Sequence, residues 1–272
     1  MNIVIEPKIT VVGQSEFIPH PEYDIPPEED HALALTAFSA KTCYNSFGID
    51  GRSCEDNQRA IMEHKHGSVL EHYHVSMMIE GITRGLSLEL NRHRSFNISQ
   101  RSTRYTAEED AAFVLEPYFA MLYEKYRPHF IKGTGWVITN PDSHDEWTDS
   151  NRLMGHYLLL GHLNSLSRSQ KDYEYQVELL EKLNPNELSG FDLRKWARGK
   201  ARNVLPHALE TKGTWTNNLR GWRWFIESRS SRHAEPEIRV LANGVLDALR
   251  VVSPVHFEDF KANGTHDNII DR

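Results

Sequence analysis

The stretch HYHVSMMIEGITRGLSLELNRHRSFNISQRSTRY, residues 72–105, decides the interpretation of this chain. Its first nine residues alternate between two faces, and the more apolar face carries Tyr73, Val75, Met77 and Ile79. This is the period of a half-buried strand. Residues 82–92 then have helical spacing, whereas 92–105 have almost no apolar periodicity. The stretch predicts a strand, a helix and a polar functional segment in direct succession.

The flanking sequence predicts further strands and helices around this strand. Strands are expected over 3–13, with a break at Pro7, and over 211–216. Helices are expected over 30–44, 55–65, 152–166, 171–183, 191–205 and 219–229. The last core helix is predicted by the apolar residues Ile238, Leu241, Ala242, Val245 and Leu249.

These elements indicate an α+β fold, a single mixed domain over 1–272 in which helices flank a central antiparallel sheet. Residues 106–185 read as a helical insertion with a turn-rich stretch at 139–151. Residues 263–272 read as a loose tail. No glycine-rich GxGxxG follows a strand, so no Rossmann-type dinucleotide site is indicated.

Composition limits the class of protein. A hydrophobic fraction of 39% is enough for a packed core, and a net charge of −7 argues against a general polyanion binder. Cys43 and Cys54 are too few for a disulfide scaffold, and we interpret them as ordinary buried thiols. Neither a signal peptide nor an 18-residue apolar run is evident, so we expect a soluble cytoplasmic protein without membrane contact.

The basic segment 92–105 is the sharpest chemical feature. It carries Arg92, Arg94, Arg101 and Arg104, interleaved with Ser95, Asn97, Ser99, Gln100, Ser102 and Thr103. Guanidinium groups bind phosphate bidentately, and short hydroxyl and amide side chains bind the remaining polar edges of a small ligand. This composition is typical of a nucleotide-phosphate site. It also fits a solvated basic loop, a loop paired with acidic neighbours, or a nucleic-acid contact.

A second basic row and several histidines allow rival functions. Arg194, Arg198 and Arg202 recur every four residues on one predicted helix, and with 92–105 they could bind nucleic acid. A metal-dependent nucleotide hydrolase is a third candidate. His72 and His74 share a strand face, but no cysteine or carboxylate completes a known ligand spacing, so we expect no metal.

The spacing within 92–105 resembles a family signature. Arg92-His93-Arg94, seven further residues and then Ser102 are similar to the RHR-x7-S motif of the flavin-dependent thymidylate synthases. Thr103-Arg104-Tyr105 matches that motif's continuation. Further blocks resemble the family in order, at 66–72, 82–90, 201–206 and 218–238, whereas 106–185 matches poorly.

The resemblance implies reductive methylation of dUMP, with FAD as the cofactor. It implies that FAD is bound by Ser68, Arg92, His93, Arg94, Gln100, Asn218 and Arg220. Trp224 stands where relatives carry a polar residue that touches flavin, so it either stacks on FAD or packs. For dUMP the implied residues are Glu89, Arg92, Gln100, Arg101, Ser102, Thr103, Arg104, Arg202 and Arg229. Arg229 is the implied catalytic residue, a fixed cation on the uracil ring.

The resemblance also implies the remaining reactants and the assembly. NADPH reduces FAD, methylenetetrahydrofolate donates the one-carbon unit, and the sites are shared between subunits of a homotetramer. Neither cysteine lies in a Pro-Cys-His setting, so no covalent thiolate nucleophile is expected. Nucleic acid is not expected as a partner.

Overall fold

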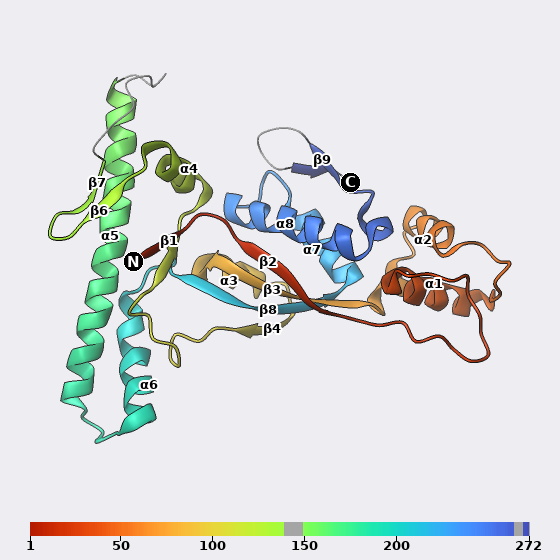
Figure 1. Cartoon of the computed structure of the whole chain (residues 1–272), viewed down its shortest axis with the longest axis horizontal. Coiled ribbons are helices and arrows are strands. Elements are labelled where there is room, and N and C mark those ends of the chain that lie inside the picture. Colours follow the sequence, from red (N-terminus) through yellow and green to blue (C-terminus); the bar gives the residue numbers. More distant parts are fainter. Residues whose placement is uncertain (139–148, 264–268, 272) are drawn as a thin grey trace. The chain divides into compact units, whose positions relative to one another are not determined.

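The computed structural model describes residues 1–138, 149–263 and 269–271 (Figure 1). The chain forms two compact units that interleave along the sequence. Unit 1 comprises Met1–Glu6, Gly81–Ser87 and Gln100–Thr211. Unit 2 comprises Pro7–Glu80, Leu88–Ser99 and Lys212–Arg272. The single domain expected over 1–272 stays a prediction.

A four-stranded antiparallel sheet confirms the predicted α+β class. Its strand order is β2 (Lys8–Gln14), β3 (His74–Thr83), β8 (Glu210–Asn218) and β4 (Asn97–Gln100). Most of the sheet belongs to unit 2, and β3, β4 and β8 each continue into unit 1 at one end. The alternation predicted for the strand is confirmed, because its apolar residues are at most 1% exposed: Tyr73, Val75, Met77 and Ile79.

Helices α7 (Leu219–Arg229) and α8 (Pro236–Val252) pack on the sheet within unit 2. Figure 1 shows α8 lying along β2. The backbone of α8 approaches the side chain of Ile9 so closely that a Cβ on Gly244 would clash with Cδ1 of Ile9. Helix α7 is fixed by Trp222, whose indole Nε1 donates to the carbonyl of Val75 at 3.1 Å. All five apolar residues predicted for the last helix are buried.

A second part of unit 2, formed by two helices and a short helical turn, packs around the buried His256. Helices α1 (His31–Tyr44) and α2 (Cys54–Glu63) meet the short helix η3 (Pro254–Phe257) at His256. Its Nε2 lies 3.1 Å from Thr36 Oγ1 and 3.2 Å from Gln58 Oε1, and its Nδ1 lies 2.8 Å from Ser253 Oγ. These hydrogen bonds satisfy a ring that is fully buried.

Unit 1 is built on its longest helix. Helix α5 (Asp149–Leu183) packs against α4 (Pro117–Tyr126), β7 (Gly135–Val137) and α6 (Gly190–Ala201). Strand β6 (His129–Ile131) pairs with β7, and β1 (Asn2–Val4) pairs in parallel with β5 (Ala112–Val114). The shared core includes Phe113, Leu122, Leu159, Leu163 and Leu209. The remaining short elements are α3 (Arg84–Leu90), which crosses from unit 1 into unit 2, η1 (Gly67–Glu71) in unit 2 and η2 (Arg202–Val204) in unit 1.

Two helices predicted over 152–166 and 171–183 are one continuous helix, so that prediction is wrong. The apolar pattern breaks at Ser167 and Gln170, yet both are buried and hydrogen-bonded. Ser167 Oγ accepts from Trp136 Nε1 at 3.1 Å, and Gln170 Nε2 donates to the carbonyl of Glu109. Tertiary partners therefore allow polar residues on the buried face.

Two smaller expectations also need correction. Cys43 is exposed on α1, whereas Cys54 is buried as predicted. The helical spacing of the sequence places Leu35, Phe38 and Thr42 on one face, but the buried face of α1 is formed by Leu33, Thr36, Ala37 and Ala40.

At the C-terminal end, β9 (Lys261–Asn263) pairs with β10 (Ile269–Asp271). The remainder of the tail predicted over 263–272 lies outside the described residues, as does most of the turn-rich stretch at 139–151. Among the described helices, none has the length and apolarity needed to cross a membrane.

The buried state of His256 predicts a pH dependence of stability. Burial and then the charge of Arg223 lower its pKa from 6.5 to about 3. Between about pH 3 and pH 6.5, His256 is therefore protonated in the unfolded chain and neutral in the native state. The contribution of His256 is complete above about pH 6.5 and falls by about 1.4 kcal/mol per pH unit below it.

We expect His256→Asn to flatten this slope in urea unfolding measured between pH 4 and 7. The pKa of His93 is also lowered, so some slope should remain in the variant. His129→Asn, a change at an exposed histidine in β6, is the control and should keep the wild-type slope. Equal slopes for wild type and His256→Asn would contradict this account.

Candidate functional site

The signature segment is divided between the two units, so its residues form two separate clusters. Residues 88–99 belong to unit 2, and residues from 100 onward belong to unit 1. The His93 cluster, in unit 2, consists of Glu89, His93, Phe96, Trp224, Phe225 and Arg229. The Arg101 cluster, in unit 1, consists of Arg84, Gln100, Arg101, Glu108, Glu210 and Thr211.

His93 is the buried member of the RHR sequence. Helix α3 ends at Leu90, and the backbone N–H of His93 donates to the Leu90 carbonyl at 3.0 Å, which turns the chain back. The imidazole is 2% exposed. Its ring centroid lies 4.8 Å from Trp224, 5.3 Å from Phe225 and 5.9 Å from Phe96, edge-on in each case. The motif is therefore anchored by its histidine.

Arg229, the last residue of α7, holds this imidazole in one tautomer. Arg229 Nε donates to His93 Nε2 at 2.8 Å, so Nε2 is the acceptor and Nδ1 carries the proton. Burial, followed by the adjacent Arg229 charge, lowers the pKa of His93 to about 4. The ring is thus neutral near pH 7. Its Nδ1–H is buried and has no hydrogen-bond partner among the described residues.

Arg229 also contacts a carboxylate. Its Nη1 lies 3.5 Å from Glu89 Oε2, and the two side chains are 27% and 35% exposed. The guanidinium therefore spans from a buried imidazole to a partly solvated carboxylate. Two residues that the resemblance assigns to dUMP, Glu89 and Arg229, are brought together here.

The two arginines of the RHR sequence are exposed, whereas its histidine is buried. Arg92 and Arg94 are exposed, and within the described part of the chain their side chains make no hydrogen bond or ion pair. Uncompensated guanidinium groups on either side of a buried ring are available to an anionic ligand. This suits the pyrophosphate of a dinucleotide.

Three other residues assigned to FAD, Ser68, Asn218 and Arg220, lie along the start of α7 and η1, whereas Gln100 belongs to the Arg101 cluster of unit 1. Asn218 caps α7, because its Oδ1 accepts from the backbone N–H of Gly221 at 2.8 Å. Arg220 packs over Gly67 and pairs with Glu71, next to exposed Ser68. A cavity of about 250 Å³ opens beside them. Its lining includes Lys65, Gly67, Leu70, Arg220 and Trp224.

Trp224 packs against His93, which is one of the two roles that the sequence left open, and stacking on FAD stays a prediction. It is 52% exposed, lines the cavity and also packs its ring edge-on against His93. Arg220 and Trp224 of α7 therefore both line the cavity, and Trp224 links it to His93.

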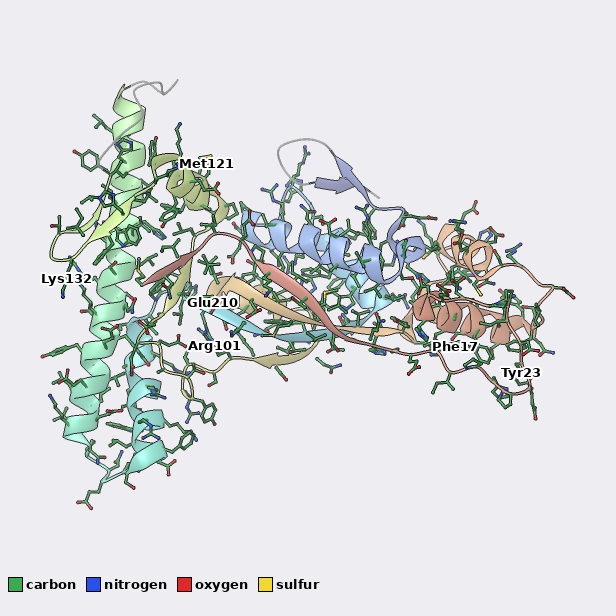
Figure 2. All side chains as sticks on the ribbon, viewed as in Figure 1. Phe17, Tyr23, Arg101, Met121, Lys132 and Glu210 are labelled. Carbon is green, nitrogen blue, oxygen red and sulfur yellow. The ribbon has the colours of Figure 1, made fainter. Side chains whose placement is uncertain are left out.

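In unit 1, Arg101 is already paired with two carboxylates, Glu108 and Glu210. Figure 2 labels Arg101 and Glu210. Arg101 Nη1 lies 3.1 Å from Glu210 Oε2, and its Nη2 lies 3.1 Å from Glu108 Oε2. Nη2 also donates to the carbonyl of Glu210 at 2.9 Å. Burial raises the pKa of Glu108, and the Arg101 charge opposes this. Arg101 therefore matches the alternative of a basic residue paired with acidic neighbours.

The neighbours of Arg101 extend the cluster. Gln100 Nε2 donates to Thr211 Oγ1 at 3.0 Å, and Arg84 Nη1 donates to the carbonyl of Arg101 at 3.1 Å. Burial lowers the pKa of Arg84, and the nearby charges of Arg101 and Arg202 lower it further. Several guanidinium groups therefore gather in unit 1.

The following residues pack along α6. Buried Thr103 accepts a hydrogen bond from Arg202 Nη1 at 3.3 Å. Arg104 lies against Gly199, with its Cγ 3.7 Å from where a Cβ would stand. Half-buried Ser102 accepts from the backbone N–H of Arg104 through its hydroxyl at 3.4 Å. The structure therefore brings Arg202 to the signature, and the dUMP-binding role that the resemblance implies for it stays a prediction.

Sequence reasoning missed Arg84, Glu108 and Glu210 as members of this cluster. A usable signal existed for Glu108, since an acidic patch follows the basic segment directly in the sequence. Nothing local marks Glu210, which is more than 100 positions away from its arginine partner. Within the described ranges, no group of three or more histidine, cysteine or acidic side chains is placed to hold a metal ion.

Comparisons with known proteins agree on one family. Residues 28–255 match the family model described as thymidylate synthase complementing protein, a range that includes 106–185. The flavin-dependent thymidylate synthase of Mycobacteroides abscessus is 33% identical over 271 residues, covering 96% of this chain and 92% of the relative. That of Mycobacterium tuberculosis is 31% identical over 265 residues, covering 95% and 93%.

Solved structures share the fold. Thymidylate synthase X of Helicobacter pylori, solved with FAD and dUMP, is 22% identical and superposes with a TM-score of 0.55 over 93% of this chain and 98% of its own. The UMP/dUMP methylase PolB of Streptomyces cacaoi, bound to 5-Br dUMP, is 18% identical with a TM-score of 0.62 over 95% and 96%.

The two kinds of arginine in the signature should differ in their effect on stability. Arg101→Ala leaves two largely buried carboxylates without their cation, so we expect the free energy of unfolding to fall by about 3 kcal/mol. Arg94→Ala removes an exposed side chain and should change it by less than about 0.5 kcal/mol. Urea unfolding at pH 7 measures both. Equal losses in the two variants would show that Arg101 is not a structural residue.

Proposed function

This chain belongs to the family of flavin-dependent thymidylate synthases, and on that premise we propose that it methylates dUMP with methylenetetrahydrofolate and NADPH. The observation that carries the proposal is the geometry of the RHR sequence. A neutral, buried His93 is held by Arg229, while the exposed Arg92 and Arg94 flank it and make no ion pair with any described residue. A buried N–H without a partner is uncommon in a purely structural segment, and the exposed guanidinium groups beside it are available to an anion.

FAD is the cofactor that these residues fit. Arg92 and Arg94 would neutralise its pyrophosphate, and Arg220, Ser68 and Asn218 would contact it from η1 and the start of α7. Trp224 offers an exposed aromatic face beside the cavity. When bound, FAD supplies the hydride chemistry for which proteins have no side chain.

Arg229 and Glu89 would act on the pyrimidine of dUMP. The Arg229 guanidinium is charged at every working pH, so it acts as a fixed cation and not as an acid or base. A cation beside the ring stabilises negative charge that develops on the pyrimidine during alkylation. The hydrogen bond to His93 and the contact with Glu89 orient the guanidinium in advance.

The phosphate and sugar of dUMP would be held by the signature residues of unit 1. Arg202, Arg104 and Gln100 offer donors, and Ser102 and Thr103 offer hydroxyl groups. Arg101 takes a supporting role in this proposal, because its donors already bind Glu108 and Glu210. Through these ion pairs Arg101 fixes the backbone between its neighbours Gln100 and Ser102.

A cysteine nucleophile is not part of the proposal. Cys54 packs with Leu33, Ala37 and Val255, and burial raises the pKa of its thiol, which opposes the thiolate form. Cys43 is exposed on α1, and its thiol donates to the carbonyl of Ser39 at 3.5 Å. Neither thiol belongs to the His93 cluster.

The reaction itself gives the first test of the proposal. Release of tritium from dUMP labelled at the alkylated carbon should require FAD, NADPH and methylenetetrahydrofolate together, since each supplies a separate part of the methyl group or its electrons. UMP labelled in the same way is the control substrate. Full turnover by flavin-stripped protein, or a preference for UMP, would reject the proposed function.

Arg229 and Arg202 should affect different kinetic parameters. Arg229→Ala should slow single-turnover oxidation of reduced flavin about a hundredfold at saturating dUMP, because charge on the pyrimidine is greatest in the transition state. Arg229→Lys keeps the charge but loses the planar fork and should rescue only part of the rate. Arg202→Ala should mainly raise the dUMP concentration required. A wild-type oxidation rate in saturated Arg229→Ala would reduce its role to binding.

Shared sites in a homotetramer can be tested by complementation. The resemblance implies that each site takes residues from more than one subunit. Mixing inactive Arg104→Ala and inactive Arg229→Ala chains should then restore part of the activity, because some mixed sites contain no changed residue. Two inactive Arg229→Ala preparations are the matched control. A monomer in sedimentation at working concentration would contradict the assembly.

A further inference from the structure

An exposed aromatic stack stands at the start of α6 in unit 1. The rings of Tyr105 and Phe191 lie 6.0 Å apart between centroids and are nearly parallel, with an interplanar angle of 9°. The two residues are 52% and 55% exposed. Isolated exposed aromatics are common on protein surfaces, but two that are stacked and fixed together form a ready-made apolar platform.

The surrounding contacts hold this platform in place. Arg198 Nη1 donates to the backbone carbonyl of Tyr105 at 3.1 Å, which ties the end of the signature to α6. Phe191 is the second residue of that helix, directly after Gly190, which has a φ of +54° that suits glycine. The Arg198 hydrogen bond therefore fixes the backbone at Tyr105, and helix α6 fixes the backbone at Phe191.

Cationic side chains border the same platform. Lys195 Nζ lies 5.1 Å from the Tyr105 ring centroid and 5.9 Å from that of Phe191. Because Phe191, Lys195 and Arg198 are spaced by four and three residues, they share one helix face with Arg194 beside them. Arg194 makes no ion pair with the described residues. Asp192 is the acidic residue in this first turn, so the local charge remains positive.

We infer that the Tyr105–Phe191 platform with Lys195 and Arg194 binds the adenosine 2′-phosphate end of the reductant NADPH. Adenine stacks on aromatic faces, and a phosphate on the neighbouring ribose would meet the cations at the edge of the stack. The inference rests on the proposed function, because that function supplies a dinucleotide phosphate as reductant.

The chemistry favours the reductant over the folate. Both carry flat rings and anionic groups. The pteridine of the folate is the reacting end, so its ring has to occupy the reaction centre. The adenine of NADPH is remote from the nicotinamide and takes no part in the chemistry, so it can occupy a platform that contains no assigned FAD or dUMP residue.

Direct binding to the FAD-loaded protein tests this inference, since bound FAD blocks its own adenine site. Calorimetry with 2′,5′-ADP and 5′-AMP as probes should show about fivefold or greater preference for 2′,5′-ADP. Lys195→Gln should abolish the preference for 2′,5′-ADP, because it removes the positive charge and keeps most of the aliphatic side chain. Phe191→Leu should weaken the binding of both probes by about fivefold or more, because leucine is apolar but has no aromatic face on which adenine can stack. Lys182→Gln, an exposed lysine on α5, is the matched control.

Flavin reduction by NADPH and by NADH in the same variants provides the second readout. Lys195→Gln should slow reduction by NADPH at subsaturating concentration and leave reduction by NADH unchanged. Equal binding of the two probes by the wild type, or unaltered binding in both variants, would overturn the inference. Weakened binding of a folate polyglutamate or of a short RNA, with 2′,5′-ADP unaffected, would also overturn it. Probe binding without dTMP formation would instead reject the proposed function alone.

Discussion

The hydrogen bond from Arg229 to His93 is the interaction on which the site in unit 2 depends. It joins the end of α7 to the turn after α3, and it fixes both the tautomer of a buried imidazole and the direction of a guanidinium. A neutral histidine is required, because a protonated ring could not accept from Arg229. The low pKa of His93 and the positive charge of Arg229 therefore support each other. Trp224 and Glu89 then extend from this pair toward the cavity and the solvent.

The signature motif divides its basic residues between two tasks. Arg101 is compensated by Glu108 and Glu210 and holds the polypeptide, whereas Arg92 and Arg94 are exposed and have no acidic partner in the part of the chain that the structure describes. A net charge of −7 would repel anionic ligands over most of the surface, so unpaired cations at one place give a local attraction that the whole molecule lacks. A motif that contained only paired arginines would be stable and would bind no phosphate.

Much of this could be predicted from local sequence, and the failures have a common physical cause. The strand at 72–80 was predictable because one face is buried and the side-chain period is two. Helix α5 was divided in error because Ser167 and Gln170 interrupt its apolar pattern, and only distant partners satisfy them. Arg94 and Arg101 look alike in the sequence. What separates them is Glu210, a tertiary neighbour that no local pattern reveals.

The central claim is that the exposed arginines of the RHR sequence hold the flavin while the buried residues hold the motif. Fluorescence titration of FAD into the flavin-stripped Arg92→Ala, Arg94→Ala double variant tests this most directly. The account predicts an FAD dissociation constant raised by about a hundredfold, because two charge-assisted contacts to the pyrophosphate are lost. A dissociation constant equal to that of the wild type would contradict the account and return these arginines to the class of solvated surface charges.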